Sequence, residues 1–223
     1  MNTEKKETSI ISESVQDYLK TIHKLQTTEA VSTTDISKEL DVSGASVTGM
    51  LKRLSTMGLV EYNSYKGVKL SLAGEKIALE IIRHHRLLEL YLKEMLGYPL
   101  EKVHEEACRL EHAISDELGN KIAEMLGDPQ YDPHGHPIPA KDGFMPLDSN
   151  KTLLSAGINQ NVKIVKLSDH DPKLLEYLEN MNLLPGVTVS VLHIEPFSGP
   201  VKIVVDGVEK IIGYEVANNI FVD

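Results

Sequence analysis

Apolar residues recur every three or four positions through the first third of the chain, which is the spacing of one helix face. Val15, Leu19 and Ile22 follow this spacing and predict a first helix. Ser32, with Asp35 three positions later, resembles a capping box, in which a side chain satisfies a free amide at a helix start. A second, short helix is therefore expected to begin after Ser32.

A third helix is predicted over residues 45–57, because apolar residues share one face there and Ser43 can cap its start. Gly58 can end this helix in the left-handed conformation, which glycine adopts without strain. Residues 59–62 and 68–71 have the pattern of two short strands around a turn. This order predicts a winged helix-turn-helix, which reads the major groove of DNA with its second motif helix and touches phosphate with its wing.

The charge of this module favours DNA. Between residues 43 and 70 the chain has four basic residues and one acidic residue, which gives a net charge of +3. Hydroxyl and amine groups early in the third helix and in the wing suit phosphates and base edges. The predicted DNA contacts are Ser43, Ala45, Ser46, Thr48, Lys52 and Lys66. The alternative is a helical hairpin whose lysines only solvate its surface.

Two long helices are predicted over residues 74–95 and 100–126. The second carries an apolar seam at spacings of four and three, formed by Val103, Ala107, Leu110, Ile114, Leu118 and Ile122. Such a seam beside a small DNA-binding module favours a homodimer interface, and the alternative is an intramolecular core. Residues 131–145, rich in proline and glycine, predict a loop and then a linker.

The last third of the chain has the pattern of a β domain. The predicted strands are 162–167, 187–194, 201–205, 208–212 and 220–222. Asp206-Gly207 is a strong signal for a two-residue hairpin. A short helix is predicted over residues 171–181, with Pro172 in its first turn. About five strands in about 70 residues suggest a small barrel.

The predicted fold is therefore mainly α with a small all-β domain. An N-terminal winged helix-turn-helix is followed by a helical dimerisation domain and a C-terminal barrel. The predicted bounds are 1–75 for the DNA-binding domain, 76–142 for the helical domain, 143–151 for a linker and 152–223 for the β domain.

Composition and charge agree with a globular, DNA-binding protein. Of 223 residues, 41% are hydrophobic and 25% are charged, which is ordinary for a globular chain. The net charge of −10 would repel DNA, but residues 14–76 carry eight basic against seven acidic residues. Most of the excess of acidic residues therefore lies after residue 76. The single Cys108, the lack of a long apolar run and the polar stretch at residues 1–13 predict a cytoplasmic protein without a membrane span or secretory signal.

The stretch from His104 to His112 offers donors for a divalent metal. On a helix, His104, Cys108 and Glu111 share a face with His112, through spacings of three and four. Imidazole, thiolate and carboxylate are donors that first-row divalent metals take. Each side chain alone is more often packed or solvated, but four together favour a metal site.

Three further groups could add donors. They are His85 with Glu89, Asp132 with His134 and His136, and Asp169 with His170 and Asp171. The alternatives are a helix surface pair for the first, a solvated loop for the second and helix capping for the third. The chain has no nucleophile elbow, phosphate loop or paired-cysteine motif, so the sequence does not support catalysis.

Several segments resemble the DtxR/MntR family of metal-dependent bacterial repressors. They are Asp17–Ile22, the wing Tyr65–Leu70, Arg83–Glu89, His104–His112 with Ser115–Glu117, and Asp132–Pro139. The resemblance covers nearly the whole chain past residue 13, and the part from about residue 152 resembles the SH3-like, FeoA-type domain of longer members. It implies a homodimer whose metal sites link the DNA-binding module to the dimerisation helices.

The resemblance also implies two metal sites. The primary site would consist of Asp17, Cys108, Glu111 and His112. The second would use Glu89 with one of two donor sets. The iron-type set matches His85 and His104, and the manganese-type set matches Asp132 and His134 with Asp169, His170 or Asp171.

The primary site mixes hard and soft donors. In the family, the position of Asp17 is methionine in iron-type members and aspartate in manganese-type members, whereas Cys108 matches the iron type. Because carboxylate oxygen suits Mn(II), the favoured cofactor is Mn(II), with Fe(II) as the alternative. The predicted function is a metal-activated repressor of metal-uptake genes that binds double-stranded operator DNA as a homodimer. The alternative is a metal-binding enzyme or metal-trafficking protein that does not bind DNA.

Overall fold

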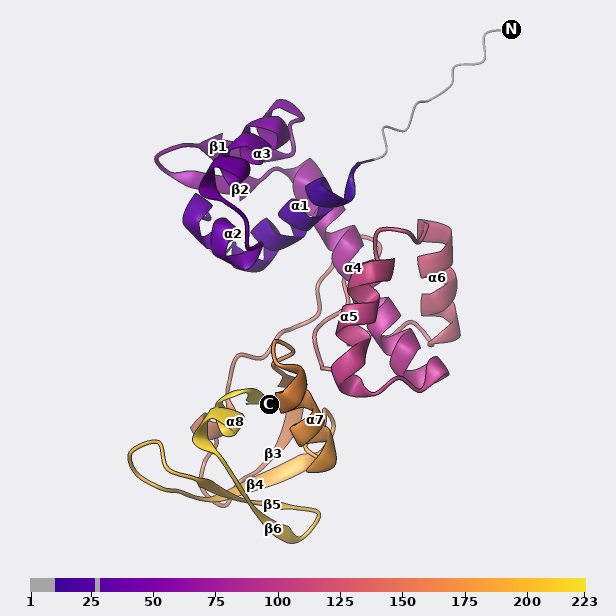
Figure 1. The fold of residues 1–223 in the computed structure, drawn as a ribbon. Helices are drawn as coiled ribbons and strands as arrows, with labels where there is room; N and C mark the ends of the chain where they lie inside the picture. The colour runs from indigo at the N-terminus through magenta and orange to yellow at the C-terminus, as the bar shows by residue number, and fades with distance from the viewer. Residues whose placement is uncertain (1–10, 27–28) are drawn as a thin grey trace, which may run out of the picture. The chain divides into compact units, whose positions relative to one another are not determined.

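The structure, a computed structural model, describes residues 11–26 and 29–223. It divides into two compact units, the first ending at Ile82 and the second beginning at Arg83 (Figure 1). Residues 1–10, which belong to the stretch predicted not to be a secretory signal, lie outside the described residues. Within the described ranges, no helix is long and apolar enough to cross a membrane.

The first unit is the predicted winged helix-turn-helix. It contains α1 (Glu13–Leu25), α2 (Thr33–Glu39), α3 (Gly44–Thr56), β1 (Val60–Asn63) and β2 (Gly67–Leu70). The Ser32 hydroxyl accepts a hydrogen bond from the Asp35 amide, and Ser43 does the same for Ser46, which confirms both predicted caps. Gly58 follows α3 with a φ of +73°, in the left-handed region that its lack of a side chain permits.

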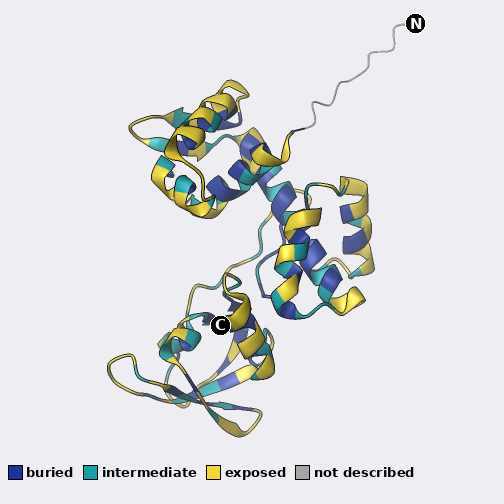
Figure 2. Cartoon of the chain, viewed as in Figure 1, coloured by how far each residue is buried: buried dark blue, intermediate teal, exposed yellow. Residues whose placement is uncertain are grey.

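The core of this unit forms where the apolar faces of its helices meet the wing. Leu19, Ile36 and Leu51 are completely buried, one from each of the three helices. Figure 2 shows buried and exposed residues side by side on the helices of this unit. Full burial of such a side chain stabilises the fold by about 1.5–3 kcal/mol. The recognition helix α3 is therefore fixed by its inner face, and residues of its outer face such as Ser46 and Lys52 stay exposed.

The long helix α4 (Leu72–Leu96) runs close to its predicted bounds, but the predicted helix over 100–126 is wrong. The chain forms α5 (Leu100–Leu110) and α6 (Asp116–Met125), separated by a turn. The physical reason is Ser115, whose hydroxyl accepts a hydrogen bond from the Leu118 amide and begins a new helix. Glu111 and His112 therefore lie in a turn rather than within a helix.

The predicted seam divides between the inside and the outside of the second unit. Val103, Ala107 and Ile122 are buried in the helical core, whereas Leu110 and Leu118 are exposed. The buried part of the seam thus belongs to an intramolecular core, which was the alternative to a homodimer interface. The exposed part leaves apolar side chains on the surface of the helical domain, as a dimer interface requires.

The C-terminal domain is one five-stranded antiparallel sheet in the order β6-β5-β4-β3-β7. Its strands are β3 (Asn161–Leu167), β4 (Thr188–Ile194), β5 (Val201–Val205), β6 (Val208–Ile212) and β7 (Ile220–Val222). Asp206 and Gly207 have φ values of +52° and +77°, which suit the tight hairpin that they predict. The predicted short helix is α7 (Pro172–Asn180), whereas α8 (Tyr214–Asn218) and the turn of 3₁₀ helix Leu153–Ser155 were not predicted.

Candidate metal centre

Glu89 of α4 is buried, and its carboxylate faces three imidazoles. Its Oε1 atom is 3.0 Å from His85 Nε2 and 3.0 Å from His104 Nδ1, on α4 and α5. Its Oε2 atom is 3.8 Å from His134 Nδ1, in the loop after α6. One carboxylate therefore faces residues of both donor sets that the family resemblance implies for the second site.

His85 extends the cluster toward the predicted primary site. Its Nδ1 atom is 2.5 Å from Glu111 Oε2 and 4.0 Å from Cys108 Sγ. His112 follows in the turn, with Nε2 3.3 Å from Glu111 Oε1. His85 thus lies between Cys108 and Glu111 of the predicted primary site, and the turn after α5, rather than one helix face, places Glu111 and His112.

The proline-rich loop supplies a second group of donors. Asp132 Oδ1 accepts hydrogen bonds from the backbone amides of His134 at 2.8 Å and His136 at 3.0 Å, which fixes the loop. His136 Nδ1 lies 3.4 Å from Asp132 Oδ2 and 3.8 Å from Asp169 Oδ2, after β3. The loop therefore collects side chains from two parts of the second unit.

The trio Asp169, His170 and Asp171 does not act as a group. The Asp171 carboxylate accepts a hydrogen bond from the Lys173 amide at 2.9 Å and caps α7, which is the alternative considered from the sequence. The His170 side chain is 66% exposed and faces the Asp169 carboxylate at 3.5 Å. Asp169 is therefore the member of the trio whose carboxylate reaches the loop donors, and the structure does not bring His170 and Asp171 to them.

The loop contains buried polar atoms that make no hydrogen bond within the described part of the chain. They are His134 Nδ1 and Asp132 Oδ2. A buried polar atom without a partner costs about 1–3 kcal/mol, and few are left so in folded proteins. Imidazole nitrogen and carboxylate oxygen are also donors for divalent cations. These residues therefore fit a divalent metal ion beside Glu89.

Burial and charge pairing act in opposite directions on the ionisable groups. Burial alone would lower the pKa of His85, but the Glu89 carboxylate and a hydrogen bond with Cys108 raise that pKa well above its ordinary value. Burial would raise the pKa of Glu89, and His85 and further imidazoles hold it well below its ordinary value. Hydrogen bonds with Cys108 and Glu89 raise the pKa of His104 to about 9. The cluster thus holds protonated imidazoles and ionised carboxylates, so metal binding to these nitrogens releases protons.

The DNA-binding candidates lie on one helix and on the wing of the first unit. Ser43 caps α3, and Ala45, Ser46 and Lys52 are exposed along it. Thr48 is half-buried, and its hydroxyl donates a hydrogen bond to the Gly44 carbonyl at 2.9 Å, so this hydroxyl is already partly engaged. These positions form a polar surface of the kind that a recognition helix presents to a groove.

The wing adds one residue that the sequence interpretation did not select. Tyr65 is 97% exposed at the turn between β1 and β2, next to the exposed Lys66. Asn63 Oδ1 accepts hydrogen bonds from both of their amides and shapes the turn. The signal was present in the sequence, because an aromatic residue in a wing between a strand end and a glycine has little to pack against.

Asp17 lies on α1 in the first unit and is half-buried. Its role as a primary ligand stays a prediction.

Three family models match the chain in succession. Residues 11–68 match the iron-dependent repressor N-terminal DNA-binding domain, and residues 72–140 match the iron-dependent repressor metal-binding and dimerisation domain. Residues 151–223 match the FeoA domain.

The chain belongs to the iron-dependent repressor family.

Individual relatives agree with this membership. The iron-dependent repressor IdeR of Mycobacterium tuberculosis is 32% identical over 224 residues, covering 92% of this chain and 95% of that protein. A solved manganese-dependent transcriptional repressor in complex with manganese is 34% identical, with a TM-score of 0.82, covering 93% of this chain and 98% of that one. The structure of ScaR with bound Zn²⁺ is 33% identical, with a TM-score of 0.75, covering 94% of this chain and 98% of that one.

Membership confirms the family that the motifs indicated, and with it a metal-dependent transcriptional repressor that binds DNA and dimerises. The predicted fold class, with an SH3-like FeoA-type domain at the end, is confirmed as well. The family consists of DNA-binding repressors, so the alternative of a metal-binding enzyme or metal-trafficking protein without DNA binding does not hold. The relatives include iron-dependent and manganese-dependent repressors, so divalent metal dependence is common to them and the metal differs.

Proposed function

We propose that this chain is a Mn(II)-activated repressor of metal-uptake genes, with Fe(II) as the alternative activator. The observation that supports Mn(II) is the buried pair His134 Nδ1 and Asp132 Oδ2, which lack hydrogen bonds within the described residues and lie at a carboxylate-rich site. Together with Glu89 and Asp169 this set is rich in oxygen, which suits Mn(II) better than a softer metal. A repressor that responds to the imported metal closes uptake when the metal is abundant.

The proposed second site consists of Glu89, Asp132, His134 and Asp169, with His85 and His104 as the alternative partners of Glu89. The proposed primary site consists of Asp17, Cys108, Glu111 and His112. Asp17 is included because it occupies the family position on the first helix. A divalent cation held by these residues would supply positive charge that offsets the repulsion among their carboxylates.

The chain would act on double-stranded operator DNA as a homodimer in the cytoplasm. The two copies of α3 would enter successive major grooves, and this arrangement fixes the spacing of the two half-sites. Lys52 and Lys66 would contact phosphates, and Ser43, Ala45, Ser46 and Thr48 would face base edges or phosphates. The division into 1–75, 76–142, the linker 143–151 and 152–223 is part of this proposal.

The test begins with selection of a binding duplex. A library of random duplexes is selected with the full-length protein in Mn(II), and the selected duplex is labelled for fluorescence anisotropy. Affinity is then measured at fixed salt in Mn(II), in Fe(II) without oxygen, and in a chelator. We expect tight binding in Mn(II), weaker binding in Fe(II), and loss of specific binding in chelator, because a chain of net charge −10 is otherwise repelled by phosphate.

Two results would contradict the proposal. Equal affinity in chelator and in Mn(II) would show that the metal does not activate DNA binding. Tight binding in Fe(II) with weak binding in Mn(II), at matched free metal concentrations, would transfer the assignment to iron.

A further inference from the structure

His134 is held on two sides by groups outside the metal cluster. Its backbone carbonyl accepts a hydrogen bond from the Leu167 amide of β3 at 2.8 Å. Its ring Nε2 atom lies 3.4 Å from the Leu100 carbonyl. Because a carbonyl oxygen can only accept, Nε2 is the nitrogen that carries a hydrogen, and Nδ1 is directed at Glu89. This orientation presents Nδ1 as the metal donor, as partners on the other ring nitrogen do in metal sites.

Leu100, which supplies that carbonyl, is itself fixed by the β domain. It is the first residue of α5, yet its side chain is only 1% exposed and belongs to the core of the C-terminal domain. Its amide lies 3.4 Å from Glu179 Oε2 on α7. This amide is one of the unpaired donors at a helix start, where a carboxylate is favoured. Lys93 Nζ, near the end of α4, lies 2.5 Å from Glu179 Oε1 and holds the same carboxylate.

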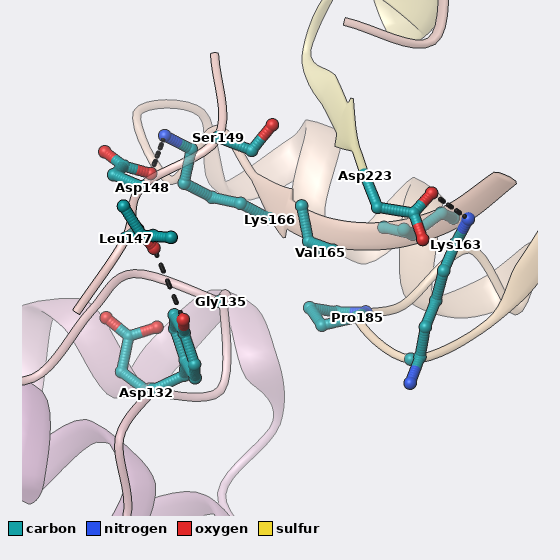
Figure 3. Close-up of a pocket in the computed structure, with 13 residues that line it drawn as sticks. Asp132, Gly135, Leu147, Asp148, Ser149, Lys163, Val165, Lys166, Pro185 and Asp223 are labelled. Carbon is teal, nitrogen blue, oxygen red and sulfur yellow. Dashed lines mark hydrogen bonds and ion pairs between the residues drawn. The ribbon is translucent and has the colours of Figure 1, made fainter. Parts of the chain in front are cut away.

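Other contacts fix the backbone of this loop: the Arg86 guanidinium donates a hydrogen bond to the Pro137 carbonyl, and Gly135 packs against the backbone of β3. Asp132 and Gly135 also line a cavity of about 640 Å³, together with Val165 and Lys166 of β3 (Figure 3). These contacts hold the backbone of the loop, and the orientation of the His134 ring is set separately. The Leu100 carbonyl is the point that sets the ring of His134.

We propose that Glu179 is a positioning residue for the second metal site, acting through Leu100 on the imidazole of His134. This inference rests on the second site of the proposed function. Glu179 joins α7 of the FeoA-type domain to the start of α5 and the end of α4, so the β domain sets the geometry of a site whose ligands lie mainly outside it. Glu179 touches no proposed ligand directly.

The test measures Mn(II) binding to the full-length protein by titration calorimetry. Glu179→Ala is compared with Glu176→Ala, an exposed glutamate on the same helix that has no ion pair among those seen in the described residues. We expect Glu179→Ala to weaken the second Mn(II) by about tenfold and to leave the first unchanged, because the loss of a group that orients a metal ligand typically costs 10–100-fold. Glu176→Ala should bind both ions as the parent chain does.

Two further variants separate positioning from a general effect on folding. Glu179→Gln retains an acceptor for the Leu100 amide and should recover most of the affinity lost in Glu179→Ala. Lys93→Met removes the ammonium group that pairs with the Glu179 carboxylate. It should give a smaller loss of Mn(II) affinity, confined to the second ion. Unchanged second-site affinity in Glu179→Ala, or equal losses at both sites, would overturn the inference.

The number of Mn(II) ions that the parent chain binds separates this inference from the proposed function. A parent chain that binds only one Mn(II) would overturn the positioning role, because there would be no second site to set. The repressor proposal would survive that result if Mn(II) still switched DNA binding on.

Discussion

Gly135 lies where the loop that carries Asp132 and His134 crosses the β domain, and Gly135→Ala should damage both stability and the proposed second metal site. Its φ is +91°, a conformation that residues with a side chain rarely adopt. A methyl group at this position would lie 2.0 Å from the Val165 carbonyl oxygen and 2.8 Å from Lys166 Cα. Both neighbours are backbone atoms of β3, so neither can rotate away, and the loop or the strand must move.

Two costs add in this variant. Alanine at a positive φ costs about 1–2 kcal/mol relative to glycine. Relief of the clash needs a movement of about 1 Å in packed backbone, and strain of this kind costs about 1–3 kcal/mol. The free energy of unfolding should therefore fall by about 2–5 kcal/mol, which corresponds to roughly 4–20 °C in melting temperature for a protein of this size.

Gly186→Ala is the matched control. Gly186 has a φ of +95°, but no atom of the described residues lies within 4 Å of a methyl group placed there. This variant should bear only the first cost, about 1–2 kcal/mol, and should bind both Mn(II) ions. Thermal melts and Mn(II) calorimetry are recorded for both variants. If they lose equal stability, or if Gly135→Ala keeps an intact second site, the close approach of Gly135 to β3 does not position the loop.

Three further experiments, with four variants, test other parts of the molecule. Lys52→Ala should weaken binding to the selected duplex and reduce the slope of log affinity against log salt by about two for a dimer, one phosphate contact per protomer; an unchanged slope would show that Lys52 faces away. Asp17→Met should shift activation of DNA binding from Mn(II) toward Fe(II), because a thioether replaces a carboxylate; unaltered Mn(II) activation would remove Asp17 from the ligands. Asp169→Ala should reduce Mn(II) from about two to about one per chain, whereas Asp171→Ala should keep both and cost about 1 kcal/mol through loss of a helix cap. The reverse pattern in calorimetry and thermal melts would make Asp171 the ligand.

Local signals in the sequence predicted the first unit almost completely. Its helices begin at side chains that cap them, such as Ser43, and end at residues such as Gly58, so the information lies within a few positions. The incorrect prediction of a single helix over residues 100–126 also comes from a local signal. The apolar seam continues through residues 110–118, but the Ser115 cap outweighs periodicity and starts a new helix.

The cluster of candidate donors around Glu89 was predictable only as far as those donors lie on one helix or in one loop. His104 and Cys108 are four residues apart on α5, and spacing alone brings them together, with 3.7 Å between Nε2 and Sγ. By contrast, the contact between His136 and Asp169 and the bond between His134 and Leu100 join residues more than 30 positions apart. These depend on how the β domain packs against α5, which no local pattern encodes. Glu179 could not be selected from the sequence for the same reason.

The two donor sets that the family resemblance offers for the second site share one carboxylate in space. Glu89 Oε1 faces His85 and His104, and Oε2 faces His134. The two donor sets differ in the contacts that their nitrogen atoms already make. His85 lies between Glu89 and Glu111, within 3.0 Å of each, so a cation there would have to replace strong charge-assisted contacts. His134 Nδ1 faces Glu89 Oε2 at 3.8 Å without a hydrogen bond within the described residues, so a cation bound there would replace a longer and weaker contact. We therefore propose that a metal ion at Glu89 gains more free energy on the face toward His134 than on the face toward His85 and His104.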